Sequence, residues 1–322
     1  MKMKRYLTAV IIILLSSNSI AYAKSNLMDM LETAKQIVEA APFTKETLNH
    51  LNNQEIKQPG KCPQHYPFGL PQIVSTEKEK IERRSFYLCE MKYAVQYDPA
   101  TKNPIWVAET LKGSEQANTF VHRVDNFQPH PKVPRRAQAT LDDYKGSKFD
   151  RGHMAPAANM IDQKSMEESF YLTNIVPQVG PNMNRGIWAD LEALVRRWAV
   201  SRGEVAVMTG PIFKNNVTIG QSKVWVPTHL YKVVVDTKTQ ESIAFIMPNQ
   251  QIITRKTKYL DEGNPNYPQT TPENAINCGR VCTINNFIVP LSEVEKHTGL
   301  VLFPKANIVN RYQAGRMWHV KN

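Results

Sequence analysis

The chain has 322 residues, of which 42% are hydrophobic and 21% are charged, a composition typical of globular proteins rather than disordered ones. Its formal net charge is +11, from 40 Lys and Arg against 29 Asp and Glu. This excess of cations favours a polyanionic partner such as nucleic acid, an acidic polysaccharide or an anionic envelope surface. Charge alone does not choose among these partners.

Residues 1–23 have the pattern of a secretory signal peptide: cations, a short apolar run and the cleavage site Ala21-Tyr22-Ala23. The apolar run is shorter than the ~20 residues that a membrane-spanning helix needs. We therefore expect cleavage after Ala23 and export to the periplasm or the medium, with no membrane association afterwards. Residues 24–64 show a helical pattern and are expected to form an N-terminal helical extension, followed by one folded domain over 65–322.

The later residues predict a mixture of strands and helices. Short runs that mix β-branched, aromatic and polar residues predict strands at 85–88, 92–97 and 105–108, and further strands are expected at 205–209, 224–226, 230–236 and 242–247. A helical period covers 184–200, a short helix is expected at 291–298, and 125–148 are predicted to form a long basic loop. These elements predict an α+β fold with a central antiparallel sheet flanked by helices.

The four cysteines, Cys62, Cys89, Cys278 and Cys282, are expected to form two disulfides in an oxidising compartment. Three pairings are compatible with four cysteines, and the spacing favours Cys62–Cys89 and Cys278–Cys282. A zinc site is the alternative. Cys-x3-Cys without a nearby histidine gives that alternative weak support.

The sharpest motif is Asp150-Arg151-Gly152-His153, which is followed by Met154-Ala155-Pro156-Ala157-Ala158-Asn159. A lone histidine is usually inert, but this one has an arginine beside it and a glycine that lets the backbone turn. A second polar cluster follows: Asn174-Ile175-Val176-Pro177-Gln178, then Asn184-Arg185-Gly186-Ile187-Trp188, and Glu192.

If 184–199 form one helix, Asn184, Trp188 and Glu192 share a face at positions i, i+4 and i+8. Asn184 could then direct its carbonyl oxygen at a cation, with Glu192 one or two turns away. The alternative interpretation makes Asn184 a helix cap and Glu192 a solvated charge.

Together, the two clusters contain the residue types that phosphodiester hydrolysis needs: a base for water and a site for a cation that neutralises phosphoryl charge. His153, with an ordinary pKa of about 6.5, can accept a proton near neutral pH. Mg²⁺ prefers oxygen ligands and often takes only one or two protein groups, such as the Asn184 carbonyl. Arg151 can hold a phosphoryl oxygen through its planar guanidinium.

This arrangement resembles the DNA/RNA non-specific endonucleases of the ββα-metal (His-Me finger) group, the family of Serratia nuclease and endonuclease G. The resemblance runs from about Phe68 to Phe303. It also includes Trp106-Val107-Ala108, Thr209-Gly210-Pro211-Ile212-Phe213 and Val226-Pro227-Thr228-His229, in family order. It implies cleavage of DNA and RNA that leaves a 5′-phosphate and a 3′-hydroxyl.

The resemblance also implies a role for each matching residue. His153 matches the general base, and Asn184 matches the single protein ligand to Mg²⁺, with Mn²⁺ as a substitute metal. Glu192 matches an acidic residue that contacts the metal through water, and Arg151 matches an arginine that contacts the phosphate. Supporting roles fall to Asn174, Gln178, Trp188 and Asp150, the last of which is expected to tie its loop to the backbone. Arg185 is expected to bind substrate, and a homodimer is expected by analogy with some members.

One position departs from the pattern of the family's bacterial branch, which places an active-site arginine just after the Trp-Val-Ala strand. Here that stretch reads Ala108-Glu109-Thr110-Leu111, and endonuclease G-like members also have an acidic residue there. Arg135 and Arg136, from the predicted basic loop, are the candidate cations to replace it and bind substrate. The departure leaves rate and product detail open.

Two other functions stay open: a catalytically inactive nucleic-acid-binding or uptake protein on the same fold, and an exported nuclease toxin or effector. An inactive protein would be expected to lack His153 or Asn184, and both are present. A metalloprotease and a serine hydrolase are disfavoured because the sequence has no H-E-x-x-H and no G-x-S-x-G. His229 is expected to be a packed structural histidine rather than a second base.

Overall fold

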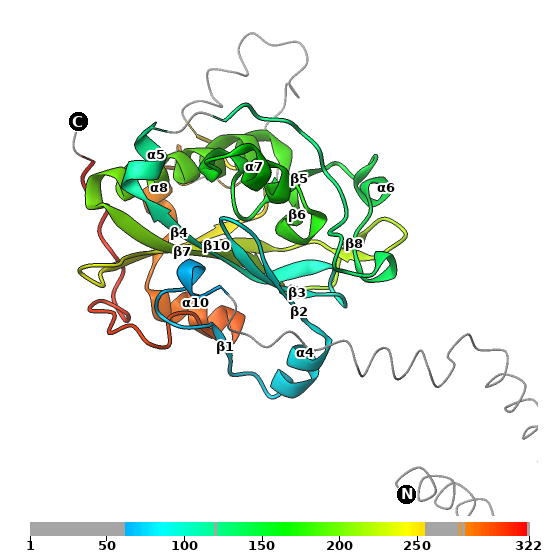
Figure 1. Ribbon diagram of the computed structural model, residues 1–322, viewed down its shortest axis with the longest axis horizontal. Coiled ribbons are helices and arrows are strands. Elements are labelled where there is room, and N and C mark those ends of the chain that lie inside the picture. Colours follow the sequence, from blue (N-terminus) through cyan, green and yellow to red (C-terminus); the bar gives the residue numbers. More distant parts are fainter. Residues whose placement is uncertain (1–61, 119–120, 255–275, 277, 279–280, 321–322) are drawn as a thin grey trace, which may run out of the picture. The chain divides into compact units, whose positions relative to one another are not determined.

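The computed structural model describes residues 62–118, 121–254, 276, 278 and 281–320 (Figure 1). The predicted signal peptide and nearly all of the predicted helical extension lie outside the described residues. The part that is described is built on a seven-stranded sheet with helices on both faces. The predicted α+β fold with a central antiparallel sheet is confirmed.

The sheet has the strand order β12-β11-β10-β7-β4-β3-β2, and each neighbouring pair is antiparallel. Its strands are β2 (Phe86–Cys89), β3 (Ala94–Asp98), β4 (Asn103–Lys112), β7 (Glu204–Ile212), β10 (His229–Asp236), β11 (Ser242–Pro248) and β12 (Ile288–Val289). Six of the seven strands predicted from the sequence lie in this sheet, with ends that differ by a few residues from the prediction. Runs of β-branched residues such as Val233-Val234-Val235 favour the pleated conformation.

Smaller elements surround the sheet. Three two-stranded ribbons pair β1 (Gln72–Ile73) with β13 (Leu300–Val301), β5 (Phe149–His153) with β6 (Ile175–Val179), and β8 (Thr218–Ile219) with β9 (Val224–Trp225). The α-helices are α4 (Lys78–Arg84), α5 (Gly113–Asn118), α6 (Leu141–Tyr144), α7 (Gln163–Ser169), α8 (Ala189–Arg202) and α10 (Leu291–Thr298). Short 3-10 turns lie at Pro63–His65, Arg135–Ala137, Ala157–Asn159, Leu172–Asn174 and Ile284–Phe287. The predicted loop over 125–148 therefore contains one 3-10 turn and α6.

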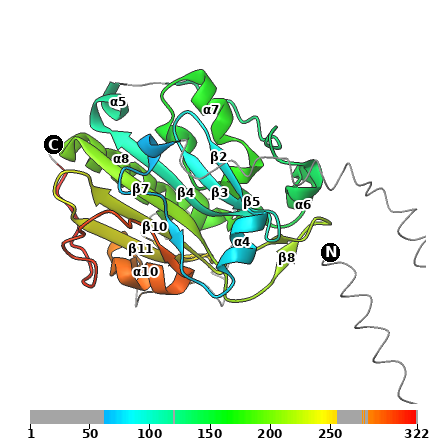
Figure 2. The ribbon, with the colours of Figure 1, turned by 60° about the horizontal axis from the view of Figure 1, so that its bottom comes forward.

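Different elements cover the two faces of the sheet (Figures 1 and 2). Helix α8 and the β5–β6 ribbon lie on one side, and α10 lies on the other. Along β10, Leu230 and Val234 belong to the core that includes α8, whereas Val233 and Val235 belong to the core that includes α10. The alternation of a strand thus sends successive side chains into two separate cores.

The segment Gly180–Trp188, which joins β6 to α8, departs from the single helix predicted over 184–199. The backbone is non-helical at Pro181, at Asn182 (φ 63°) and at Gly186 (φ −126°, ψ −114°). Regular α-helix begins only at Ala189. Because Gly186 breaks the helix between Asn184 and Glu192, these two side chains do not share one regular helical face, and that expectation was wrong.

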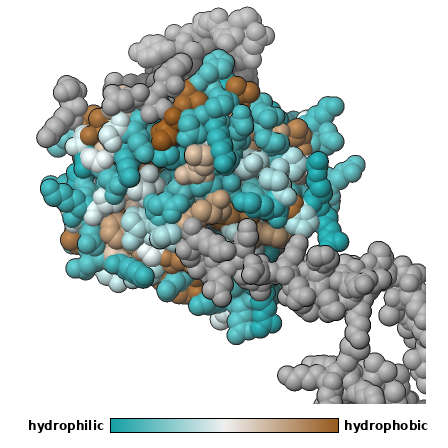
Figure 3. Space-filling model, viewed as in Figure 1, coloured by the Kyte–Doolittle hydropathy of each residue, from teal (hydrophilic) through white to brown (hydrophobic). Residues whose placement is uncertain are grey.

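The disulfides join Cys62 to Cys89, with Cα atoms 6.0 Å apart, and Cys278 to Cys282, with Cα atoms 5.0 Å apart. This is the pairing that the spacing favours, and it leaves no thiol for the alternative zinc site. The face of the molecule in Figure 3 is mostly hydrophilic, with small separate hydrophobic patches. Within the described ranges, no helix is long and apolar enough to cross a bilayer.

Candidate active site

The motif Asp150-Arg151-Gly152-His153 lies on β5, which pairs with β6 in a register that sets Asp150 opposite Gln178 and His153 opposite Ile175. The chain then runs through Gly180–Trp188 into α8, so two strands and a helical segment form the ββα unit that the resemblance implies. Gly152 is required here, because a Cβ atom at this position would lie 2.1 Å from Oε1 of Gln178.

Asn174 fixes the backbone on the far side of His153. Its Oδ1 accepts a hydrogen bond from the Ala155 amide at 2.9 Å, and its Nδ2 donates to the carbonyls of Ala155 and Ser169, both at 2.9 Å. The Asn174 side chain is fully buried, and its own carbonyl accepts from the Met154 amide at 3.0 Å. These bonds hold the chain that leaves the motif, which fits the predicted supporting role.

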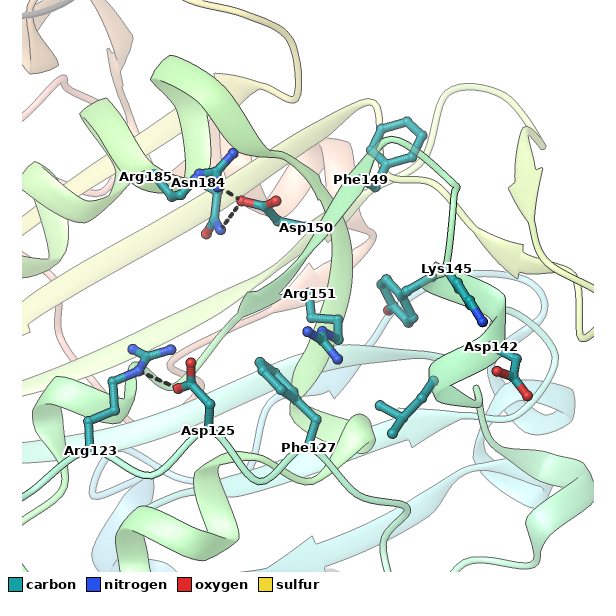
Figure 4. Close-up of a pocket in the computed structure, with 12 residues that line it drawn as sticks. Arg123, Asp125, Phe127, Asp142, Lys145, Phe149, Asp150, Arg151, Asn184 and Arg185 are labelled. Atoms are coloured by element: carbon teal, nitrogen blue, oxygen red, sulfur yellow. Dashed lines mark hydrogen bonds and ion pairs between the residues drawn. The ribbon is translucent and has the colours of Figure 1, made fainter. Parts of the chain in front are cut away.

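A cleft of about 570 Å³ opens beside β5 (Figure 4). Four of the predicted site residues line it: Asp150, Arg151, Asn184 and Arg185. The cations in its lining are Arg123, Lys145, Arg151 and Arg185. A concave surface rich in cations suits a ligand with several phosphates.

Arg151 is exposed at this cleft. Its guanidinium carbon lies 4.2 Å from the centre of the Phe127 ring, and Figure 4 shows the two side chains against each other. Stacking on an aromatic ring restrains the long side chain while the guanidinium N–H groups stay accessible. Arg123, at the same cleft, is paired with Asp125 at 2.6 Å.

Asp150 connects two of the predicted site residues. Its Oδ2 accepts a hydrogen bond from Nδ2 of Asn184 at 2.9 Å and lies 3.3 Å from Nε of Arg185 (Figure 4). We expected Asp150 to tie its loop to the backbone; the carboxylate instead orients two side chains. Because Nδ2 of Asn184 donates to Asp150, the carbonyl oxygen Oδ1 of Asn184 faces away from Asp150.

His153 is buried to 9% exposure behind Phe127, which lines the cleft; the His153 ring lies 5.3 Å from the Phe127 ring and 4.8 Å from the Phe170 ring. Nε2 is buried and has no hydrogen-bond partner among the described residues. Burial, together with the cations Arg123 and Arg151, lowers the pKa of His153 to about 3. The imidazole is therefore neutral at physiological pH.

This lowered pKa predicts how the stability of the fold depends on pH. An unfolded chain binds a proton at His153 below about pH 6.5, whereas the folded chain binds it only near pH 3. The unfolding free energy should therefore fall as pH drops through this window, by up to about 1.4 kcal/mol per pH unit from this residue. Urea unfolding from pH 4 to pH 7 should show a flatter dependence in His153→Gln than in wild type. Equal slopes in the two proteins would contradict the expectation.

The other predicted residues lie beneath the cleft rather than in it. Trp188 and Gln178 are buried, and Glu192 is half-buried in the first turn of α8. Arg135 and Arg136 are exposed on a 3-10 turn and are not among the residues that line the cleft. This turn is held next to β3 and β4 by Lys102, whose Nζ donates to the Arg136 carbonyl at 2.9 Å. The cleft is lined by Arg123 and Lys145, and not by Arg135 and Arg136 as we expected.

Sequence reasoning did not identify a group of polar side chains under the site: Glu109, Asn159, Arg196 and Lys232. Glu109 and Lys232 are both 1% exposed, on β4 and β10. The sequence held a signal for Lys232, because it occupies an inward position between Leu230 and Val234 in a strand that is otherwise apolar. A charged residue at such a position is rarely buried without a specific partner.

No group of three or more His, Cys, Asp or Glu side chains that could hold a metal occurs within the described parts of the chain. A structural zinc or a carboxylate-rich calcium site is thus not found there. A Mg²⁺ site with one amide ligand and several waters needs no such group. The carbonyl oxygen of Asn184, which faces away from Asp150, is an oxygen ligand of the type that such a cation takes.

Comparison with known proteins agrees with this geometry. Residues 75–307 match the model of the DNA/RNA non-specific endonuclease family. Nuclease C1 of Cunninghamella echinulata var. echinulata is 35% identical over 257 residues, which cover 75% of this chain and 88% of that protein. Mitochondrial endonuclease G of Homo sapiens is 32% identical over 259 residues, 76% of this chain and 74% of that one. A chain in the crystal structure of the EndoG/EndoGI complex has a TM-score of 0.59 and 29% identity, covering 78% of this chain and 94% of that chain.

The expectation of export to the periplasm or the medium is contradicted by the names of these relatives. Similar proteins from Homo sapiens, Bos taurus and Schizosaccharomyces pombe are named as mitochondrial nucleases. A cationic N-terminal segment without acidic residues does not distinguish secretion from other targeting, because mitochondrial transit peptides share this charge pattern. Residues 1–23 themselves lie outside the described part of the chain.

Proposed function

The chain belongs to the DNA/RNA non-specific endonuclease family, and from that membership we propose that it hydrolyses DNA and RNA with His153 as the general base. The observation that carries this assignment is that an exposed arginine and an oriented asparagine line one cleft, with a neutral histidine packed behind its aromatic lining. Arg151 and Asn184 line the cleft, and the His153 ring packs against Phe127, which lines it too.

His153 is unprotonated and so available as a proton acceptor at neutral pH, while the same burial makes it a weaker base than a free imidazole. Its neutral form is held by burial, and because Nε2 is the enclosed nitrogen, Nδ1 is the one that accepts the proton. The water oxygen then bonds to phosphorus while the bond from phosphorus to the 3′ oxygen breaks; the departing 3′ oxygen takes a proton from solvent water, and His153 returns its proton to solvent. The products of this step are a 5′-phosphate and a 3′-hydroxyl.

We propose Asn184 as the single protein ligand of a Mg²⁺ ion. Asp150 engages Nδ2, and Oδ1 makes no hydrogen bond with the described residues, so an oxygen donor is left open at the cleft. Bound there, Mg²⁺ would neutralise charge on the phosphoryl oxygens, with Mn²⁺ as a substitute. Glu192 would face the ion through water.

Arg151 is placed to hold the phosphate, with Arg185 and Lys145 along the same cleft for neighbouring phosphates. Contacts to phosphate carry no sequence information, which accounts for cutting without sequence preference. Glu109, where the family's bacterial branch has an arginine, is buried and takes no direct part in holding substrate.

These phosphate contacts predict a steep salt dependence of binding. In EDTA, the logarithm of the affinity for a single-stranded oligonucleotide should fall linearly with the logarithm of salt concentration, measured by fluorescence anisotropy. Arg151→Ala should reduce the slope by about 0.7, the value for one lost phosphate contact. Arg135→Ala removes the same charge outside the cleft and should leave the slope unchanged. A flat response in the wild type would refute this mode of binding.

The activity itself is tested by digestion of supercoiled plasmid and total RNA with the purified full chain, in Mg²⁺ or in EDTA. Degradation of both substrates only with metal is the expected result. Binding of the plasmid without cleavage, across several divalent metals, would overturn the proposal and favour an inactive nucleic-acid-binding protein on the same fold.

A further inference from the structure

Four ionisable side chains meet between α8 and the sheet. Glu109 on β4 and Lys232 on β10 lie on the sheet face that packs against α8, since their neighbours Val107 and Val234 belong to the core on that side. Glu192 and Arg196, four residues apart, come from α8 itself. The group contains two acids and two cations.

Short contacts connect this group to its surroundings. Lys232 Nζ donates to Oγ1 of Thr209 at 2.7 Å and lies 5.0 Å from the centre of the Trp188 ring. Thr209 is opposite Lys232 in the β7–β10 register, so the ammonium group lies over β7, towards β4. A neutral hydroxyl and an aromatic ring do not balance a buried positive charge, so Lys232 needs carboxylates nearby.

Both carboxylates of the group act electrostatically on Lys232, without an ion-pair contact to it. Burial lowers its pKa, and Glu192 and Glu109 each raise it again. Glu109 accepts a hydrogen bond from Nδ2 of Asn159 at 2.9 Å through Oε1, while its buried Oε2 has no hydrogen-bond partner among the described residues. Oδ1 of the same asparagine accepts from Nη1 of Arg196 at 3.2 Å.

The two acids are not equivalent in position. Glu109 is enclosed at 1% exposure, whereas Glu192 is only half-buried and starts α8 next to the segment that carries Asn184. If Glu109 were neutral, Glu192 would be the only anion left for both Lys232 and Arg196. Its carboxylate would then be held in the core by both cations.

We propose that Glu109 is a positioning residue: by supplying the counter-charge of Lys232 and bonding Asn159, it leaves the Glu192 carboxylate available to the metal site. This inference rests on the proposed function of that site. It also gives a role to the residue that stands where the family's bacterial branch has an arginine. The acid balances charge under the site instead of contacting the substrate.

The test compares Glu109→Gln, Lys232→Met and the double variant, with Thr209→Val as a control that removes a hydrogen bond but no charge. Glutamine keeps an oxygen that can accept from Asn159, so the single substitution isolates the charge. Mn²⁺ binding is measured directly, by the loss of the free-ion electron paramagnetic resonance signal. The measurement is made at pH 8, because burial raises the pKa of Glu109 to about 7 and the carboxylate is charged above it.

Glu109→Gln should weaken Mn²⁺ binding by about tenfold, as expected for loss of a residue that orients a metal-facing group. The double variant should regain most of that affinity, because Glu192 and Arg196 then balance each other, and Thr209→Val should bind as wild type does. In urea unfolding, the double variant should lose less stability than the two single variants together.

Wild-type affinity in Glu109→Gln, or additive losses in the double variant, would overturn the inference while the proposed function stands. A wild-type protein that neither binds Mn²⁺ nor cuts nucleic acid would overturn both. If Glu109→Gln fails to fold, the double variant decides: folding with near wild-type Mn²⁺ affinity supports the balance of charges, and folding with weakened affinity contradicts it.

Discussion

His153→Ala should lower the rate of phosphodiester cleavage by about 10²–10⁴-fold, the usual contribution of a general base. The alanine leaves no group that can take a proton from water at the wall of the cleft. The substrate affinity should change little, because the cleft cations Arg151 and Arg185 are untouched. Single-turnover nicking of plasmid at saturating enzyme separates the rate of cleavage from binding, and anisotropy in EDTA checks the affinity.

A second histidine provides the control. His229, at the start of β10, is half-buried, and its Nδ1 lies 3.1 Å from the Thr228 hydroxyl. His229→Ala removes an equivalent ring away from the cleft and should cut at close to the wild-type rate. Wild-type cleavage by the His153 variant would remove this residue from the mechanism. Circular dichroism must show both variants folded, because the His153 ring packs against Phe127 and Phe170.

The strands of the sheet were predictable because their composition is a local signal. The central strands have side chains in two cores, so β7, β10 and β11 are largely continuous apolar runs rather than alternating ones. The prediction of one helix over 184–199 was wrong, because the spacing of apolar residues gives no information on backbone breaks. Apolar spacing continues through Gly186, but the backbone there is non-helical, as it is at Pro181.

The candidate site also contains residues that a local motif predicts and residues that it does not. Asp150, Arg151 and His153 were identifiable because they lie within four consecutive residues of one strand, β5. Glu109, Asn159 and Lys232 come from three distant segments, and only the strand order β4-β7-β10 and the placement of α8 bring them together. In the sequence, Glu109 stands out only as a departure from the pattern of the family's bacterial branch. Its partners are not predictable there, because they depend on the register between strands.

The basic residues show the limit of composition as evidence. Arg135 and Arg136 belong to a cationic stretch, and charge alone made them candidates for substrate binding. In the structure, Arg123 and Lys145 line the cleft and Arg135 and Arg136 do not, because the position of a side chain relative to β5 depends on the path of the loop. Net charge predicts the class of partner, and the fold decides which cations meet it.

Asn184→Ala should abolish metal-dependent cleavage, with a loss of about a thousandfold, because an ion that stabilises phosphoryl charge contributes several kcal/mol. Its Oδ1 is the amide oxygen that the Asp150 carboxylate leaves open by accepting from Nδ2. Raising Mg²⁺ should recover little activity in Asn184→Ala. Asp150→Ala keeps the ligand but loses its orientation, so it should need about 10–100-fold more Mg²⁺ for half-maximal cleavage.

The measurement is a Mg²⁺ titration of plasmid nicking for the three proteins, with Asn216→Ala, an exposed asparagine between β7 and β8, as the control. Asn184→Asp sharpens the test. A new carboxylate would face the Asp150 carboxylate in place of the amide that donates to it, so like charges would repel and the ligand would be misplaced. Full activity at ordinary Mg²⁺ in Asn184→Ala would rule this residue out as the ligand. Wild-type metal dependence in Asp150→Ala would instead show that the orientation of Asn184 does not depend on that carboxylate.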